Sequence, residues 1–315
     1  MNPKILITGA TGATGGSAIL ELLQRNIGVR ALVHKIDERS DKLGTQGVEI
    51  VQGDLTDFEA VNGALKGMEA AYFVYPIQVP GILEATAFFA EAAEEQGVRA
   101  IVNMSQVSAR RNAKSHASQN HWIAERLLDR SGIPVTHLRP TFFAEWLMYQ
   151  SRAIREQDIL PLPFGDGRYA PITGEDQGRV IAAILSDPAE HAGKTYPLFG
   201  PKELSQYEIV EILSGIVGRT ITYVPIDIET FQENFKARGF TPHFIQHISS
   251  VAIDCRNGLF AGTNDWVEEL TGRKPLSIAD YITKNKPMFA SARPQSLNDS
   301  FEDHDSNHAG AELMI

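Results

Sequence analysis

The chain has 315 residues, 43% of them hydrophobic and 22% charged, which is typical of a globular protein with enough apolar material for a large core. The formal net charge of -10 excludes an overall basic surface for nucleic acid or anionic lipid. No apolar run is long enough to span a membrane, no signal peptide is recognisable, and the single cysteine excludes an intramolecular disulfide. We therefore expect a soluble cytoplasmic protein.

Short apolar runs alternate with helical patterns through the first half of the chain. The expected strands are 4–9, 29–34, 48–54, 70–76, 100–105 and 135–140. The expected helices lie near 14–26, 57–66, 80–96 and 118–131. The strands are nearly continuously apolar, as strands covered by helices on both faces are. This alternation predicts an α/β fold with a Rossmann-type, doubly wound parallel sheet.

After residue 150 the pattern changes. The stretch ILPLPFGDGRYAPITGEDQG, residues 159–178, is rich in glycine and proline and is interpreted as an irregular connection. The later segments are interpreted as a helix near 176–186, a strand at 194–200, a helix at 205–218, a strand at 221–226 and mostly helix over 228–283.

These patterns predict two domains and a tail. A Rossmann domain is expected over 1–155, with elements near 176–200 returning to it. A smaller domain of mixed α/β, mainly helical structure is expected over 156–290 and would cover the substrate. Residues 291–315 are polar and acidic with few large apolar groups, so a disordered acidic tail is expected there.

A glycine-rich turn follows the first strand directly. In KILITGATGATGG the glycines form a G-x-x-G-x-x-G pattern that leads into the apolar-periodic segment SAILELL. Such glycines permit a tight turn, close approach of the backbone to a pyrophosphate, and close packing of helix on strand. The helix N-terminus then offers N–H groups and a positive dipole end to the phosphates. We therefore expect a dinucleotide site, or alternatively an unliganded turn, at Gly9, Thr11, Gly12, Ala13, Thr14 and Gly15.

The residues after the second strand bear on the choice between NAD and NADP. An NAD site usually has an acidic residue there to bind the ribose hydroxyls. In ALVHKIDERS that place is taken by His34 and Lys35, with Arg39 close behind and no carboxylate before Asp37. Cations at this place suit a 2′-phosphate, so NADP(H) is favoured over NAD(H). A solvated basic loop is the alternative.

Further cofactor-binding candidates follow the carboxyl ends of the other expected strands, which meet at one edge of a doubly wound sheet. The motif GDL would place residues beside the adenine, and the later candidates would contact the cofactor or the nicotinamide. They are Asp54, Leu55, Tyr75, Pro76, Ile77, Ser105, Pro140, Thr141, Phe142 and Phe143. Ser108 is an alternative to Ser105, and core packing is the alternative for the two phenylalanines.

Four motifs together resemble those of one family. The G-x-x-G-x-x-G spacing, GDL, SGIPVTHLRPTFFAEW at 131–146 and LTGRKPLS at 270–277 are similar to the NmrA-like group of atypical short-chain dehydrogenases/reductases. The resemblance implies a Rossmann-type fold and an NAD(P)H cofactor. The group includes quinone and dye reductases, phenylpropanoid reductases, and members proposed to be redox sensors without catalysis.

The helix expected over 118–131 departs from the wider superfamily, whose standard members carry a catalytic Tyr-x-x-x-Lys there. Counting back from Glu125, which resembles a glutamate common in the NmrA-like group, the Lys position is His121 and the Tyr position is Ala117. If that face of the helix meets the cofactor, His121 points at the ribose or the nicotinamide. The resemblance thus implies a catalytic role for His121, as a group that orients the ribose or donates a proton. A partly buried structural histidine is the alternative.

The missing dyad narrows the chemistry. Epimerases and alcohol dehydrogenases of this fold need an activated base to remove a proton from a hydroxyl. The reduction of quinones, azo compounds and conjugated dyes does not need such a base. We therefore predict an NAD(P)H-dependent reductase that holds a small, apolar, conjugated acceptor against the nicotinamide, between the two domains. Two alternatives stay open: a non-catalytic NADP(H)-sensing regulator that binds a protein partner, and a phenylpropanoid-type reductase, whose chemistry commonly uses the missing lysine.

No metal, nucleic acid or membrane partner is expected. Two histidine pairs have i, i+4 spacing, His243 with His247 and His304 with His308, but neither shows the third ligand that zinc needs. The first pair is interpreted as a helix surface, and the second lies in the expected tail. Cys255 is interpreted as buried filler, and a homodimer stays open.

Overall fold

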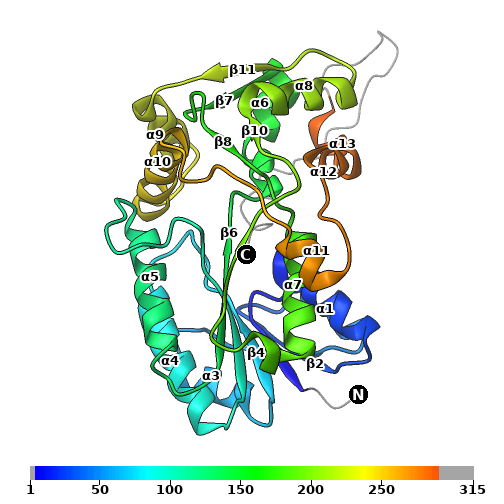
Figure 1. The fold of residues 1–315 in the computed structure, drawn as a ribbon, viewed down its shortest axis with the longest axis vertical. Helices are drawn as coiled ribbons and strands as arrows, with labels where there is room; N and C mark the ends of the chain where they lie inside the picture. Colours follow the sequence, from blue (N-terminus) through cyan, green and yellow to red (C-terminus); the bar gives the residue numbers. More distant parts are fainter. Residues whose placement is uncertain (1–3, 291–315) are drawn as a thin grey trace.

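The larger part of the molecule is a seven-stranded parallel sheet (Figure 1). The computed structural model describes residues 4–290, so the expected tail lies outside the described residues. The strands are β1 (Ile5–Ile7), β2 (Val29–Val33), β3 (Glu49–Gln52), β4 (Ala70–Phe73), β5 (Ala100–Met104), β6 (Val135–Pro140) and β9 (Thr195–Leu198). Their order is β3-β2-β1-β4-β5-β6-β9, and every pairing is parallel. The predicted doubly wound sheet is confirmed, and its strand order switches between β1 and β4.

Helices cover both faces of this sheet (Figure 1). One face carries α1 (Ala13–Gln24), α7 (Gly174–Ser186) and α11 (Trp266–Thr271). The other carries α3 (Phe58–Leu65), α4 (Ile82–Glu95) and α5 (His116–Leu128). Each set of helices forms a continuous apolar core with the sheet. This two-sided burial explains why the central strands are continuously apolar in sequence.

The β3 edge of the sheet departs from the expected pattern. β3 is the outermost strand, and its Glu49 and Gln52 are exposed. A short helix, α2 (Glu38–Thr45), leads into it and occupies part of what was considered a basic loop. The sequence did not predict this helix because the buried residues among its eight are Ser40 and Leu43 alone, too few to give a helical periodicity.

Above the sheet in Figure 1 lies a smaller, mainly helical part, which we call the cap. Its helices are η1 (Ala144–Gln150), α6 (Ser151–Gln157), α8 (Gln206–Val217), α9 (Ile228–Ala237), α10 (Pro242–Arg256), α12 (Ile278–Lys284) and α13 (Lys286–Phe289). Its strands are β7 (Ile159–Leu162) with β11 (Thr222–Pro225), and β8 (Arg168–Tyr169) with β10 (Leu204–Ser205).

The interpretation of 159–178 as an irregular connection is therefore wrong. β7 and β8 lie within it, and α7 begins there. The partners of these strands, β11 and β10, come much later in the chain, and the local glycines and prolines hide such long-range pairing. The division of the chain into domains at residue 155 stays a prediction.

Three later elements pack with the sheet layer rather than the cap. β9 pairs with β6, and α7 packs on α1, both from the segment near 176–200 that was expected to return. A third returning element, α11, was not expected: its Val267 is fully buried in the same core. Between α7 and α11 runs η2 (Pro188–His191), a short surface turn before β9.

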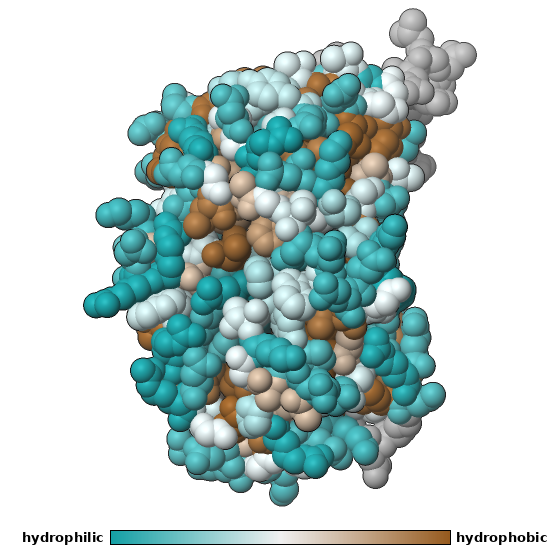
Figure 2. All heavy atoms as spheres, in the orientation of Figure 1, coloured by the Kyte–Doolittle hydropathy of each residue, from teal (hydrophilic) through white to brown (hydrophobic). Residues whose placement is uncertain are grey.

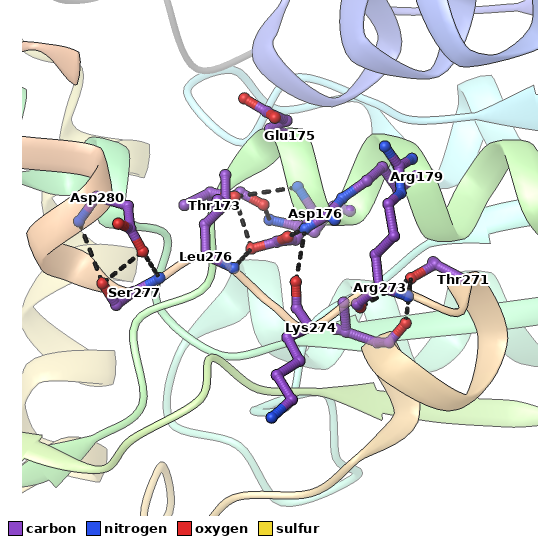
Figure 3. A network of polar contacts seen from close by, with 12 residues as sticks. Thr173, Glu175, Asp176, Arg179, Thr271, Arg273, Lys274, Leu276, Ser277 and Asp280 are labelled. Atoms are coloured by element: carbon purple, nitrogen blue, oxygen red, sulfur yellow. Dashed lines mark hydrogen bonds and ion pairs between the residues drawn. The ribbon is translucent and has the colours of Figure 1, made fainter.

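The first turn of α7 joins the sheet layer to the chain that leads into α12 (Figure 3). Buried Asp176 accepts hydrogen bonds at Oδ2 from the Thr173 hydroxyl (2.8 Å) and from the Leu276 N–H (2.9 Å), and it forms an ion pair with Arg179. Arg179 also donates to the Lys274 carbonyl oxygen at 3.3 Å. The LTGRKPLS motif therefore has a structural role, because it connects the cap to the N-terminus of α7.

Gly178→Ala tests the close packing of α7 on α1. A Cβ at Gly178 would collide with Ser17 and lie 2.7 Å from the Ala18 nitrogen, so the helices would have to separate. Overpacking of this kind costs about 1–3 kcal/mol, and we expect a lower melting temperature.

The control is Gly215→Ala in α8, where a Cβ meets no atom within 4 Å. Alanine is the better helix former, so this variant should match the wild type or gain up to ~1 kcal/mol. Equal melting temperatures for the two variants would contradict close packing of α1 on α7.

Candidate functional site

The turn between β1 and α1 has a shape that accommodates an anion. Gly9 has a φ of 57°, which favours glycine, and its carbonyl oxygen accepts a hydrogen bond from the Gly12 N–H at 3.0 Å. A Cβ at Gly15 would lie 2.8 Å from the Gly9 carbonyl carbon, so a larger residue would push the helix away from the turn. No side chain caps α1, which leaves its first N–H groups available to a phosphate.

Side chains at the ends of β1 and β4 fix this turn to the sheet. The Thr8 hydroxyl donates to the Val74 carbonyl oxygen (3.1 Å) and accepts from the Val74 N–H (2.8 Å). The Thr14 and Tyr72 hydroxyls are 3.0 Å apart and buried, and burial raises the pKa of Tyr72. Thr11 and Ala13 are half-buried in the turn and at the start of α1.

The cations after β2 have different surroundings. His34 is exposed, and its Nδ1 lies 3.4 Å from Asp54 Oδ2. Asp37 accepts hydrogen bonds from Arg39 Nε (3.1 Å) and Nη2 (2.7 Å), and these bonds lower the Asp37 pKa. Lys35 is exposed and forms no ion pair with any residue from 4 to 290. Lys35 is therefore the cation here that no carboxylate neutralises, whereas Arg39 is drawn to Asp37.

A cavity of about 110 Å³ lies at the carboxyl ends of β4, β5 and β6, beneath the cap. Figure 2 shows hydrophobic residues gathered between the sheet layer and the cap on an otherwise mostly hydrophilic face. Of the residues predicted from sequence, the wall contains Thr14, Tyr75, Ile77, Ser105, His121, Pro140, Thr141, Phe142 and Phe143. The cavity thus reaches the first turn of α1 at Thr14 and extends to the end of β6.

The other predicted residues lie outside this wall. His34, Lys35, Arg39, Asp54 and Leu55 follow β2 and β3, and Leu55 packs against the core under α3 and α4. Pro76 lies between two wall residues without being one. Sequence reasoning missed the wall residues Val74, Gln78, Met104, Gln106, Trp146, Tyr149, His247, Val251 and Phe260. Trp146 ends the FFAEW motif, but no sequence signal distinguishes His247, Val251 or Phe260 from ordinary cap residues.

His121 is buried in the cavity wall on α5. Its Nδ1 has no hydrogen-bond partner among residues 4–290. Burial lowers the pKa of His121 to about 4, against the opposing effect of Glu125. The imidazole is therefore neutral at pH 7, and it offers one N–H donor and one acceptor nitrogen.

Glu125, one turn after His121, fixes α5 to β6. It is fully buried, and its Oε1 accepts a hydrogen bond from Arg139 Nε at 2.8 Å. Burial opposes ionisation, but the hydrogen bonds from Arg139 and the positive charge of its guanidinium outweigh it and lower the Glu125 pKa. The glutamate used to align this helix is thus a buried carboxylate with an arginine partner, and it holds the His121 face of α5 toward the cavity.

His247 was interpreted as a surface residue, and this interpretation is wrong. It is 4% exposed and lies in the cavity wall, on the cap helix α10. The His247 Nδ1 is 2.8 Å from the Ser115 hydroxyl at the N-terminus of α5. Burial lowers the pKa of His247 to about 3, with smaller contributions from His121 and His243. The i, i+4 spacing alone could not show which side of α10 faces the protein.

Aromatic side chains of the cap close the cavity. The rings of Phe142 and Phe260 are 4.3 Å apart, and Phe142 also meets Trp146 edge to face. Gln78, after β4, donates from Nε2 to the Tyr149 hydroxyl at 3.3 Å. The backbone carbonyl oxygen of Gln78 accepts a hydrogen bond from the Thr241 hydroxyl at 3.0 Å. The loop after β4 is therefore held against the cap, and aromatic rings form much of the upper cavity wall.

Within residues 4–290, no group of three or more His, Cys, Asp or Glu residues could hold a metal ion. His304 and His308 lie outside the described residues. None of the helices in that range combines the length and apolar character needed to cross a bilayer. Cys255 is buried, and burial raises its pKa to about 12.

The doubly wound sheet, the glycine turn and the cavity at its carboxyl edge define a Rossmann-type nucleotide-binding protein. A family model for the NmrA-like family matches residues 1–252, and the chain belongs to this family. The chain is 27% identical to the NAD(P)H azoreductase of Xenophilus azovorans, over 91% of this chain and 100% of that protein.

Two further matches, one to a protein sequence and one to a solved structure, extend over nearly the whole length of the matched chain. Quinone oxidoreductase 2 of Escherichia coli (strain K12) is 25% identical, over 89% of this chain and 97% of that protein. The crystal structure of an NADPH-dependent quinone oxidoreductase from Escherichia coli, complexed with NADPH, has a TM-score of 0.80 and 24% identity. That match covers 90% of this chain and 99% of the other and shows a shared fold.

The buried histidines predict how stability depends on pH. His121 titrates at about 4 in the folded protein and at its ordinary value of 6.5 when unfolded, so the unfolded state binds more protons between these values. The free energy of unfolding should therefore fall as pH falls below 6.5, by on the order of 2 kcal/mol at pH 5 for this one group. Urea titrations at pH 7.5 and 5 should show a smaller fall for His121→Gln than for the wild type.

His116→Gln is the control, because His116 is exposed on the same helix. It should keep the wild-type pH dependence. Burial raises the pKa of Glu145 to about 7, which acts in the opposite sense, so variants are compared with the wild type at each pH. If the free energy of unfolding of His121→Gln depended on pH as that of the wild type does, the fold would be shown to accommodate a charged histidine at this position.

Proposed function

We propose that the chain is an NAD(P)H-dependent reductase that transfers a hydride to a small, flat, largely apolar acceptor such as a quinone or an azo dye. One observation carries the proposal: an apolar cavity at the sheet edge begins at the uncapped N-terminus of α1 and ends under the cap. The reductase names of the similar proteins support it, because two of them act on azo and quinone acceptors by name.

The chain's own residues fit a dinucleotide. The turn packs too closely to admit a Cβ at Gly15, so the backbone at the α1 N-terminus is open to close approach and offers N–H groups for the pyrophosphate. Tyr75 and Ile77, with Pro140 to Phe143 across the sheet, would flank the nicotinamide end. A bound reduced nicotinamide supplies the hydride. The protein's part is to hold the acceptor in a dry, oriented pocket beside it.

The polar groups of the cavity suit an acceptor that needs no strong base. Ala117, at the position of the superfamily tyrosine, is buried and has no titratable group. His121 is neutral at pH 7, so it would act first as a hydrogen-bond partner of the ribose or the acceptor. Such groups can orient a conjugated acceptor, but they cannot activate an alcohol as a tyrosinate does. In this proposal the cap covers the acceptor, the role expected of the smaller domain predicted over 156–290.

Preference for NADP(H) is the finer part of the proposal. His34 and Lys35 are exposed after β2, where the adenosine ribose would lie. Since Asp37 holds Arg39, Lys35 would be the principal partner of a 2′-phosphate. Asp54, near His34, accepts hydrogen bonds from the Thr56 N–H and hydroxyl, and it would border the adenine.

The reductase is tested by following NADPH absorbance with a panel of quinones and azo dyes. We expect oxidation that depends on the acceptor, and His121→Ala should lower kcat/KM by about 10-fold or more. His116→Ala, on an exposed site of the same helix, should leave it unchanged. Tight NADPH binding without turnover on any acceptor would instead favour a nucleotide-sensing regulator, and failure to bind either nucleotide would exclude both functions.

The preference is tested by Lys35→Glu. Losing a charge-assisted contact with the 2′-phosphate and gaining repulsion should raise the Kd for NADPH by about 10-fold or more. The Kd for NADH, which lacks that phosphate, should stay within about 2-fold. Lys42→Glu makes the same charge change at an exposed site on α2 and should leave both constants unchanged. An equal loss for NADPH and NADH would contradict a role for Lys35 in selection.

A further inference from the structure

The cap contributes one imidazole to the cavity, His247 on α10. The predicted cofactor residues of the wall come from the sheet edge, from the first turn of α1 and from α5. By contrast His247, Val251 and Phe260 come from the opposite, cap side. Valine and phenylalanine offer no hydrogen bond there. His247 is therefore the imidazole through which this side of the cavity can recognise a polar atom of a bound molecule, beside Trp146 and Tyr149 of η1, which also line it.

The hydrogen bond with Ser115 fixes the His247 tautomer. The Ser115 hydroxyl is fully buried and accepts a hydrogen bond from the Ser118 N–H at 3.0 Å. Its own proton needs an acceptor, and within residues 4–290 the acceptor in reach is His247 Nδ1, at 2.8 Å. Since Ser115 donates to Nδ1, the ring proton of the neutral imidazole must be on Nε2.

The Nε2–H of His247 is left for a ligand. This atom has no hydrogen-bond partner among residues 4–290, although the side chain is 4% exposed and lines the cavity. A donor that is unpaired within the protein and borders an apolar cavity can be satisfied by a polar atom of a molecule bound there.

The helix that carries this donor is held rigidly against α5. One residue before His247, Gln246 accepts from the His116 N–H (3.0 Å) and donates to the Lys114 carbonyl oxygen (2.8 Å). Two turns later, Asp254 accepts two hydrogen bonds from Arg110, at 2.9 and 2.7 Å. Because hydrogen bonds hold α10 on both sides of His247, the Nε2–H donor has a fixed position opposite the sheet edge.

We propose that His247 Nε2–H hydrogen-bonds an oxygen or nitrogen atom of the acceptor, so that the cavity selects acceptors with a carbonyl, imine or azo group. This inference rests on the proposed reductase function and deepens it. In the reduction of a quinone, the acceptor gains two electrons and one proton as hydride, and the negative charge that develops on its oxygen faces His247. A second proton, taken from water, completes the hydroquinone.

The tautomer can be measured without any turnover. Long-range ¹H–¹⁵N NMR of the imidazoles should identify His247 as the Nε2–H form, with His247→Gln assigning the signal. Adding a non-reducible quinone analogue to the protein loaded with NADP⁺ should shift the Nε2 resonance. An Nδ1–H tautomer, or an Nε2 resonance that the analogue leaves unchanged, would overturn the proposal.

The selection is measured with two acceptors, a para-quinone and a cationic triphenylmethane dye whose nitrogens are conjugated and accept hydrogen bonds poorly. His247→Phe should lower kcat/KM for the quinone by about 10- to 100-fold and for the dye by less than about 3-fold. His247→Gln, whose amide N–H can replace Nε2–H, should recover part of the loss. If His247 had a structural role alone, His247→Phe would lower kcat/KM equally for both acceptors, and that result would overturn the proposal.

His243→Gln is the matched control, one turn earlier on α10 and outside the cavity wall. This variant should leave kcat/KM unchanged for both acceptors, and the Kd for NADPH should be the same in all three variants. If the wild type reduces no acceptor, the reductase function fails, while the NMR shift with the quinone analogue still decides whether His247 binds a carbonyl.

Discussion

The site depends on the close contacts that glycines allow around the N-terminal half of α1. A Cβ at Gly15 would strike the carbonyl group of Gly9, one at Gly174 would lie 2.6 Å from the Ala13 Cβ, and one at Gly178 would collide with Ser17. The turn holds α1 from one side and α7 holds it from the other. Because α1 is closely packed against both the turn and α7, its free N–H groups have a fixed direction.

The same packing extends to the cap. α7 carries Asp176, which receives the Leu276 N–H, and so the segment before α12 is tied to the helix that supports the nucleotide turn. On the other side of the cavity, α10 is tied to the loop before α5 by Arg110 with Asp254, and to the α5 N-cap by Ser115 with His247. The cavity therefore lies between two attachments of the cap, and its walls come from both parts of the chain.

The sequence was informative where an element must satisfy a local rule. The glycine spacing and the continuously apolar strands follow from the local contacts of βαβ units. β7 and β8 could not be predicted, because each exists through a partner far along the chain, and α2 is too exposed to show periodicity. The sheet-edge candidates gather at the cavity because parallel strands end together, whereas cap residues such as His247 reach it through tertiary packing alone.

The charges around the cavity explain what kind of chemistry its wall can support. Ionised groups close to it are paired: Glu125 with Arg139, and Asp254 with Arg110. What remains in the wall is neutral, since burial keeps both imidazoles unprotonated at pH 7. Neutral donors in an apolar enclosure interact strongly with charge that develops during a reaction, because little water competes with them. They give no advantage to a substrate that must first lose a proton. In the proposed reaction such a wall would favour acceptors that become anionic as they take up hydride, and the hydrogen-bond donors that the cap places in the wall would determine the substrate range.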